Sequence, residues 1–286
     1  AALLASRGVK LDFVLDEGLL ITDGIMKGLD KPAALIGVAE KGYATLVLTA
    51  HATPGHSSMP PRDTAIGMMS AALTRFEDHS LPARVRGSVA EMFDTLAPEM
   101  SGFNRVVLSN LWLFKPLLLR EFDKGGATRA MVRTTTALTI FNAGDKDNVL
   151  PGNAEATVNF RLLPGDTQDS VTAHVRDTVK NDKIAIAPFP GNTNPPPVTG
   201  TASTGYRVLN QTIREIFPDV IVSPGLMIAA TDSRHYAGLT DNIFRFSPVR
   251  ATSEDLKRFH GTNERLSIAN YADMIRFYLR FIQSSA

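Results

Sequence analysis

One stretch of the chain, PFPGNTNPPP from Pro188 to Pro197, limits the possible folds more than any other feature. Its content of proline, glycine and asparagine is too high for a helix or a central strand, so it predicts a linker. The sequence patterns before and after it also differ. We therefore expect a domain boundary at this point.

The sequence before the linker predicts an α+β layer. Strand-like runs occur at Tyr43–Ala50, Thr134–Asn142 and Glu155–Arg161, where β-branched residues or alternating polarity suit a sheet. Apolar residues at helical spacing occur at Pro61–His79 and Thr167–Val179. This order of elements predicts an antiparallel sheet covered by helices.

The two outer parts of the chain share another pattern. The first part has strand-like runs at Leu11–Leu15 and Ala33–Val38, and the last part alternates short apolar runs with helices at Gly205–Phe217 and Ile268–Ile282. Alternating short strands and helices predict an α/β domain, here with a mixed sheet.

These patterns predict one domain inserted into another. We expect residues 1–40 and 190–286 to form the α/β domain and residues 41–189 to form the inserted α+β domain. The length of 286 residues and the hydrophobic fraction of 44% are sufficient for two cores. The chain opens on the end of a helix without a cap, which predicts that part of the α/β domain precedes Ala1.

Composition excludes several classes of function. The chain has 30 Lys and Arg against 29 Asp and Glu and no basic run, so we expect no nucleic-acid partner. No apolar run is long enough for a membrane span, and no membrane partner is expected. There is no cysteine, so any metal must be bound by His, Asp and Glu. Localisation stays open between cytoplasm and a periplasmic or secreted location.

The motif GHSSMPP places His56 in a loop that two prolines stiffen. A stiff loop can present an imidazole rigidly to a substrate. The alternative is that His56 caps the following helix or binds nearby backbone.

Two further motifs contain possible metal ligands. LDFVLDEG places Asp16 and Glu17 where a strand leaves the sheet, the edge at which α/β folds bind ligands. FHGTNERL places His260 in a loop before the closing helix, where an imidazole can bind zinc. Helix capping for the acids and an ordinary surface position for His260 are the alternatives.

Three polar residues are candidates for substrate binding. Arg234 in ATDSRHY has the planar guanidinium that binds a carboxylate with two hydrogen bonds, although a surface salt bridge would need the same residue. Asn148 and Arg161 stand at the two ends of DNVLPGNAEATVNFR, where ordinary turn chemistry is the alternative.

Taken in order, VLDEG, GHSSMPP, NVLPGNAEATVNFRLLPGD, AATDSRHY and FHGTNERL resemble the di-zinc metallopeptidase family of aminoacylase, carboxypeptidase S, carnosinase and succinyl-diaminopimelate desuccinylase. The carboxypeptidase S branch is the most similar. The resemblance covers the whole chain and implies a catalytic α/β domain that binds two zinc ions, with an inserted α+β domain that serves as lid and dimerisation domain.

The resemblance also implies roles for individual residues. Asp16, with Glu17 as the alternative, would bind one zinc ion and His260 the other. His56 would stabilise the oxyanion in the active site of the partner subunit. By the same resemblance, the substrate carbonyl or carboxylate would contact Asn148, Arg161 and Arg234.

The family's other metal motifs are not found in this chain, which has neither His-x-Asp nor adjacent Glu-Glu. The resemblance implies a homodimeric zinc-dependent metallopeptidase or amidohydrolase that cleaves peptides or N-acyl amino acids next to a free carboxylate. The chain itself is expected to be an inactive C-terminal fragment with weak or no zinc binding. A non-catalytic interaction or scaffold protein derived from that family is the alternative.

Overall fold

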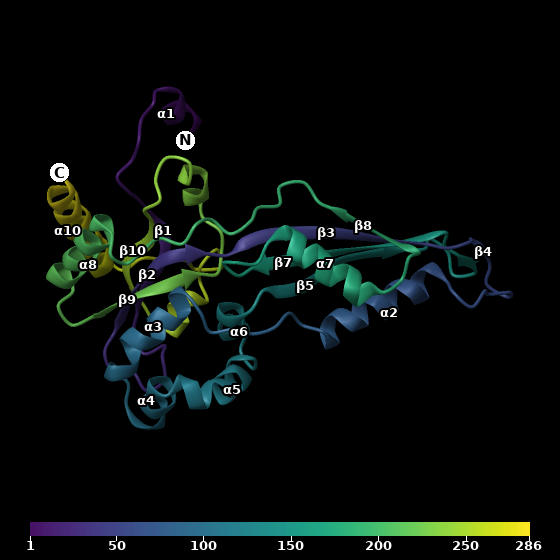
Figure 1. Cartoon of the computed structure of the whole chain (residues 1–286), viewed down its shortest axis with the longest axis horizontal. Helices are drawn as coiled ribbons and strands as arrows, with labels where there is room; N and C mark the ends of the chain where they lie inside the picture. Colours follow the sequence, from purple (N-terminus) through teal and green to yellow (C-terminus); the bar gives the residue numbers. More distant parts are fainter. The chain divides into compact units, whose positions relative to one another are not determined.

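The computed structural model describes all 286 residues and shows two compact units. The first unit comprises Ala1–Glu40, Val85–Val132 and Pro196–Ala286. The second unit comprises Lys41–Arg84 and Arg133–Pro195. The expected combination of an α/β and an α+β fold is confirmed, and Figure 1 shows the elements of both units.

An antiparallel sheet forms the second unit, with the strand order β5-β7-β3-β8. Its strands are β3 (Gly42–His51), β5 (Thr135–Ala143), β7 (Asn153–Leu162) and β8 (Ile184–Pro188). β3 pairs with β7 over its whole length without a register shift. Alternate residues of β7 are buried, as expected for a sheet with one face on the core.

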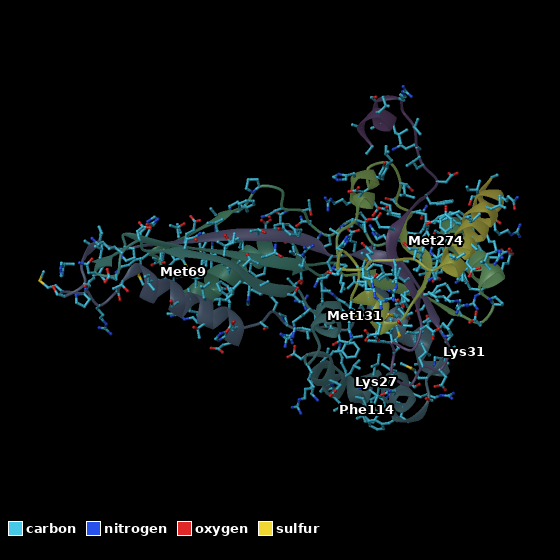
Figure 2. The ribbon with its side chains drawn as sticks, turned by 180° about the vertical axis from the view of Figure 1, so that it is seen from behind. Lys27, Lys31, Met69, Phe114, Met131 and Met274 are labelled. Carbon is cyan, nitrogen blue, oxygen red and sulfur yellow. The ribbon has the colours of Figure 1, made fainter.

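The helices α2 (Ala65–Asp78) and α7 (Gln168–Val179) contribute the other half of this core. α7 places three valines on one face, because a spacing of four residues is about one helical turn: Val171, Val175 and Val179. Met69 of α2, labelled in Figure 2, is fully buried in the same core.

A mixed sheet forms the first unit, with the strand order β1-β10-β2-β9. Its strands are β1 (Val14–Thr22), β2 (Ala33–Glu40), β9 (Ile221–Met227) and β10 (Ile243–Ala251). β1 is parallel to β10 and β2 is parallel to β9, whereas β10 and β2 are antiparallel. Every residue of β2 is buried, which fits its central position.

The helices α8 (Thr204–Ile216) and α10 (Ile268–Ser285) pack together and against this sheet. Each is preceded by a serine whose hydroxyl accepts a backbone N–H of the first turn. Aromatic rings fill much of the core between helices and sheet: Phe244, Phe246, Phe277 and Phe281. The rings of Phe246 and Phe277 meet edge to face with centroids 5.6 Å apart.

The segment Val85–Val132 differs from the expected organisation, because it belongs to the first unit and not to the inserted domain of residues 41–189. It contains α3 (Ser88–Leu96), η1 (Ala97–Glu99), α4 (Gly102–Ser109), α5 (Leu111–Phe122) and α6 (Gly126–Val132).

Contacts with the loop between β1 and β2 explain this correction. The backbone N–H of Ser101 donates to the carbonyl of Gly28 at 2.7 Å, and the Asn104 amide donates to the carbonyl of Lys27 at 2.9 Å. Lys31 pairs with Glu99 at 3.1 Å. Lys27 and Lys31 are labelled in Figure 2. These contacts join residues far apart in sequence, so the local pattern did not reveal them.

The remaining short elements are α1 (Ala2–Ser6), β4 (Gly55–His56), β6 (Val149–Leu150), η2 (Asp232–Tyr236) and α9 (Ser253–Leu256). None of the helices has both the length and the apolar character that a membrane crossing requires.

Candidate functional site

His56 and Asn148 lie together in the second unit. His56 belongs to β4, which Figure 1 labels. β4 pairs with β6, so that His56 stands opposite Val149. The backbone N–H of Ser57 donates to the carbonyl of Asn148 at 3.2 Å. Backbone pairing, and not the prolines alone, therefore fixes the loop that contains His56.

The ring of His56 is exposed and has a defined hydrogen-bonding arrangement. The backbone N–H of Ser58 donates to Nδ1 at 3.1 Å, and the Ser58 hydroxyl lies 2.9 Å from the same nitrogen. Since a backbone N–H can only donate, Nδ1 is an acceptor, and the neutral ring carries its proton on Nε2. The exposed Nε2–H is therefore available to donate to a group outside the loop.

Arg161 belongs to β7 of the second unit and lies far from Asn148. The strand register places Arg161 opposite Tyr43 and Asn153 opposite His51, at the two ends of β7. At about 3.3 Å per residue, these two ends are roughly 26 Å apart. The Arg161 guanidinium stands 4.7 Å from the centre of the Tyr43 ring. Arg161 and Asn148 thus cannot bind the same small group within one subunit.

Asp16 and Glu17 lie within β1 and do not follow it, which corrects the expected strand at residues 11–15. The pairing of β1 with β10 shifts register between Asp16 and Leu19, so the strand bulges and then continues. Asp16 is half-buried and Glu17 is exposed.

The Asp16 carboxylate accepts two backbone hydrogen bonds. Its Oδ1 accepts the N–H of Glu17 at 2.9 Å, and its Oδ2 accepts the N–H of Ser233 at 2.6 Å. Ser233 belongs to η2, and the next residue is Arg234, which is half-buried. The structure thus brings the segment that contains Arg234 to Asp16, as a shared site requires.

A buried group of side chains that is connected to Asp16 through Ser233 was not identified from the sequence. Arg245 and Glu40 form an ion pair of 2.5 Å, with exposed fractions of 0% and 1%. Glu40 also accepts the backbone N–H of Thr231 at 3.1 Å and its hydroxyl at 2.8 Å. The Thr231 and Ser233 hydroxyls are 2.6 Å apart. The signal in the sequence was an arginine inside the apolar run IFRFS, since a buried charge requires a partner.

The electrostatics of Arg245 reflect this burial. Desolvation lowers the pKa of the Arg245 guanidinium, whereas the charges of Glu40 and Asp16 raise it. Arginine remains protonated in proteins, so the first unit contains a cation with no access to solvent.

His260 is exposed in the turn after α9. Its φ of 55° is uncommon for a residue other than glycine, and Asn263 at 61° shares this backbone region. Glu264 accepts the backbone N–H of His260 at 3.4 Å. The contact therefore fixes the backbone of the turn.

Asp16 and His260 have donor atoms that suit zinc. Each Asp16 oxygen accepts one hydrogen bond and has a second lone pair for a cation. However, the structure contains no group of three or more His, Asp or Glu side chains placed to hold a metal ion. Protein zinc sites use about three or four such ligands.

Comparison with known proteins gives a consistent result. The sequence profile of the M20 peptidase dimerisation domain matches residues 38–186. The N-fatty-acyl-amino acid synthase/hydrolase PM20D1 of Xenopus tropicalis is 45% identical over 99% of this chain and 55% of its own length. The protein named probable carboxypeptidase S-like 2 of Dictyostelium discoideum is 42% identical over 96% of the chain and 53% of its own length.

The chain thus spans about half the length of these relatives. Among solved structures, the M20 family metallo-carboxypeptidase Sso-CP2 of Sulfolobus solfataricus superposes with a TM-score of 0.65. This match covers 97% of the chain and 64% of that protein, at 15% sequence identity. At this identity the match describes the fold alone.

Proposed function

The chain belongs to the M20 peptidase family, and from this we propose that it is part of a zinc-dependent hydrolase that cleaves an amide bond next to a free carboxylate. The observation that supports this function most directly is the arrangement of His56, whose exposed Nε2–H is oriented by the bonds to Nδ1. Such a donor can stabilise the oxyanion that forms when an amide carbonyl is attacked.

Asp16 and His260 are the residues of this chain that we assign to zinc, with Glu17 as the alternative carboxylate. In hydrolases of this kind, zinc polarises the carbonyl and lowers the pKa of a bound water. The sequence contains no His-x-Asp and no adjacent Glu-Glu, so the remaining ligands and the general base are not among its residues. The chain alone is therefore expected to be inactive and to retain little zinc.

The substrate in this proposal is an N-acyl amino acid or a peptide with a free carboxylate. Arg234 can bind the carboxylate with two hydrogen bonds, while Asn148 contacts the carbonyl group beside His56. Arg161 is the alternative ligand of the substrate carboxylate. The strand register separates Arg161 from Asn148, so within one subunit the two residues would not bind the same group. The name of the Xenopus relative, a hydrolase of N-fatty-acyl amino acids, supports the acyl amino acid.

A homodimer formed through the dimerisation domain is part of the proposal. The profile match to residues 38–186 supports it. In such a dimer His56 of one subunit would act on the substrate bound to the other subunit.

Hydrolysis assays on the full-length product of the gene that encodes this chain test the proposal. We expect the zinc-loaded protein to cleave members of a panel of dipeptides and acyl amino acids, including fatty-acyl derivatives, and to lose activity with a chelator. The change His56→Ala should lower kcat by about 100-fold to 1,000-fold, as for loss of an oxyanion donor.

The matched control is His51→Ala, since His51 is an exposed histidine at the end of β3 and has no assigned role. Its kcat should stay near that of the unchanged protein. Failure of the zinc-loaded protein to cleave any member of the panel would contradict the proposed activity and favour the non-catalytic alternative.

A further inference from the structure

A buried chain of contacts, here called the Glu40 network, links Arg245 to the Asp16 carboxylate. From Arg245 it passes to Glu40 at 2.5 Å, then to the Thr231 hydroxyl at 2.8 Å and to the Ser233 hydroxyl at 2.6 Å. The backbone N–H of Ser233 then donates to Asp16 at 2.6 Å. All five residues belong to the first unit.

A contribution to stability does not by itself explain why the charged pair of Arg245 and Glu40 is buried. Arg245 is fully buried, and one of its terminal nitrogens, Nη2, has no hydrogen-bond partner. Removing a charged pair from water is costly, and apolar residues of similar volume often serve stability as well or better. A burial of this kind therefore needs another explanation.

The strands on both sides of β10 leave space for Arg245. A Cβ added at Gly37 of β2 would lie 3.0 Å from the Arg245 Cβ, and one added at Gly18 of β1 would lie 2.7 Å from the same atom. Glycines on both neighbours allow the arginine to sit inside the sheet. The backbone of the sheet is thus adapted to the arginine independently of the hydrogen bonds.

The consequence of this network is the position of η2. Glu40 accepts two bonds from Thr231, immediately before η2, and the Thr231 hydroxyl meets that of Ser233. These contacts orient the backbone N–H of Ser233 towards the Asp16 carboxylate. Because Arg234 follows Ser233 in η2, they also hold the backbone of Arg234 near Asp16.

We propose that Glu40, held by Arg245, is a positioning residue that acts through Thr231 and Ser233 to set the places of the Asp16 carboxylate and of Arg234. This role rests on the proposed function, in which Asp16 binds zinc and Arg234 binds the substrate carboxylate. Neither Glu40 nor Arg245 contacts the substrate in this role. Their effect is to fix the position of the metal ligand Asp16 relative to the substrate-binding residue Arg234.

Site-resolved amide hydrogen exchange on the 286-residue chain tests the positioning without any activity assay. The change Thr231→Val keeps the shape of the side chain but removes its hydroxyl from Glu40 and Ser233. We expect exchange at the Ser233 amide to become about tenfold faster or more, as for loss of a buried hydrogen bond. Thr231→Ser, which restores the hydroxyl, should return exchange to the original rate.

Two further variants separate positioning from general destabilisation. Ser233→Ala removes the hydroxyl that lies 2.6 Å from the Thr231 hydroxyl and 3.5 Å from the Glu40 carboxylate. It should accelerate exchange of the backbone amide at position 233 while core amides of β2 keep their rates. Asp219→Asn removes the ion pair with Arg250 elsewhere on β10 and should leave the Ser233 amide unchanged. Unchanged Ser233 exchange in both Thr231→Val and Ser233→Ala, or equal acceleration of all amides, would overturn the proposal.

The functional half of the inference is tested on the zinc-loaded, full-length gene product. Thr231→Val should raise KM for the best substrate by a larger factor than it lowers kcat, because Arg234 is displaced, and Thr231→Ser should restore KM. Faster Ser233 exchange with an unchanged KM and kcat would overturn the role in the site. If the unchanged protein cleaves nothing, the proposed function fails, and the exchange data still decide whether the network positions η2.

Discussion

At the residue scale, the buried ammonium of Lys41 makes stability depend on pH. Its Nζ donates to the carbonyl of Arg133 at 2.9 Å. Burial, together with the charge of Arg161, lowers the pKa of Lys41 to about 7. Below this pH the folded chain must bury a charge, and above it the amine is neutral.

We expect the free energy of unfolding to rise with pH from about 7 to about 10, because the unfolded chain then binds a proton that the folded chain does not. The contribution of Lys41 is at most about 1.4 kcal/mol per pH unit. Denaturant titrations at several pH values in this range should show that the free energy of unfolding rises less steeply with pH in Lys41→Met. The exposed Lys10→Met is the control, and equal slopes for Lys41→Met and the unchanged chain would contradict the assignment.

Gly18 is a second residue whose environment makes a specific prediction. Its φ is +156°, and an added Cβ would lie 2.7 Å from the Cβ of Arg245. Gly18→Ala should lower the free energy of unfolding by about 1–3 kcal/mol, as for other overpacked sites. Gly238→Ala is the control, since no atom lies within 4 Å of its added Cβ. Equal costs in denaturant titrations would show that the bulge tolerates a side chain.

At the element scale, capping side chains determine where a helix begins. Thr167 caps the start of α7: its hydroxyl accepts the N–H of Ser170, while the Ser170 hydroxyl accepts the N–H of Thr167. This reciprocal pair satisfies two donors that the first helical turn leaves free. The helix then buries its valines against the sheet of the second unit.

Thr167→Ala should therefore lower the free energy of unfolding by about 1 kcal/mol, the usual effect of losing such a cap. Thr167→Ser keeps the hydroxyl and should cost little. Thermal unfolding followed by circular dichroism would measure both variants. A melting temperature equal to that of the unchanged chain in Thr167→Ala would mean that packing alone sets the start of α7.

At the scale of the whole molecule, the dimerisation domain leads to a prediction about assembly. We expect light scattering at micromolar concentration to give a mass of twice the 31.0 kDa of one chain. Dilution should shift the mass towards one chain, since an association depends on concentration. A mass of 31.0 kDa at every concentration would contradict the proposed dimer.

Much of the fold follows from local patterns in the sequence. Alternating strands, helices with one apolar face and the linker near residue 190 depend on neighbours a few positions apart, and these patterns are visible in one sequence. The segment Val85–Val132 shows the limit, because its membership of the first unit depends on contacts with the loop between β1 and β2.

The candidate site shows the same division. The sequence by itself determined which residue types are present, including His56, Asp16 and Arg234, and where the short motifs lie. Only the tertiary structure decided that Asp16 lies within a bulged strand and that Glu40 meets Arg245 across a separation of 205 residues. The physical reason is that a buried charge is stable only beside its partner, and chain folding, not local sequence, brings that partner into contact.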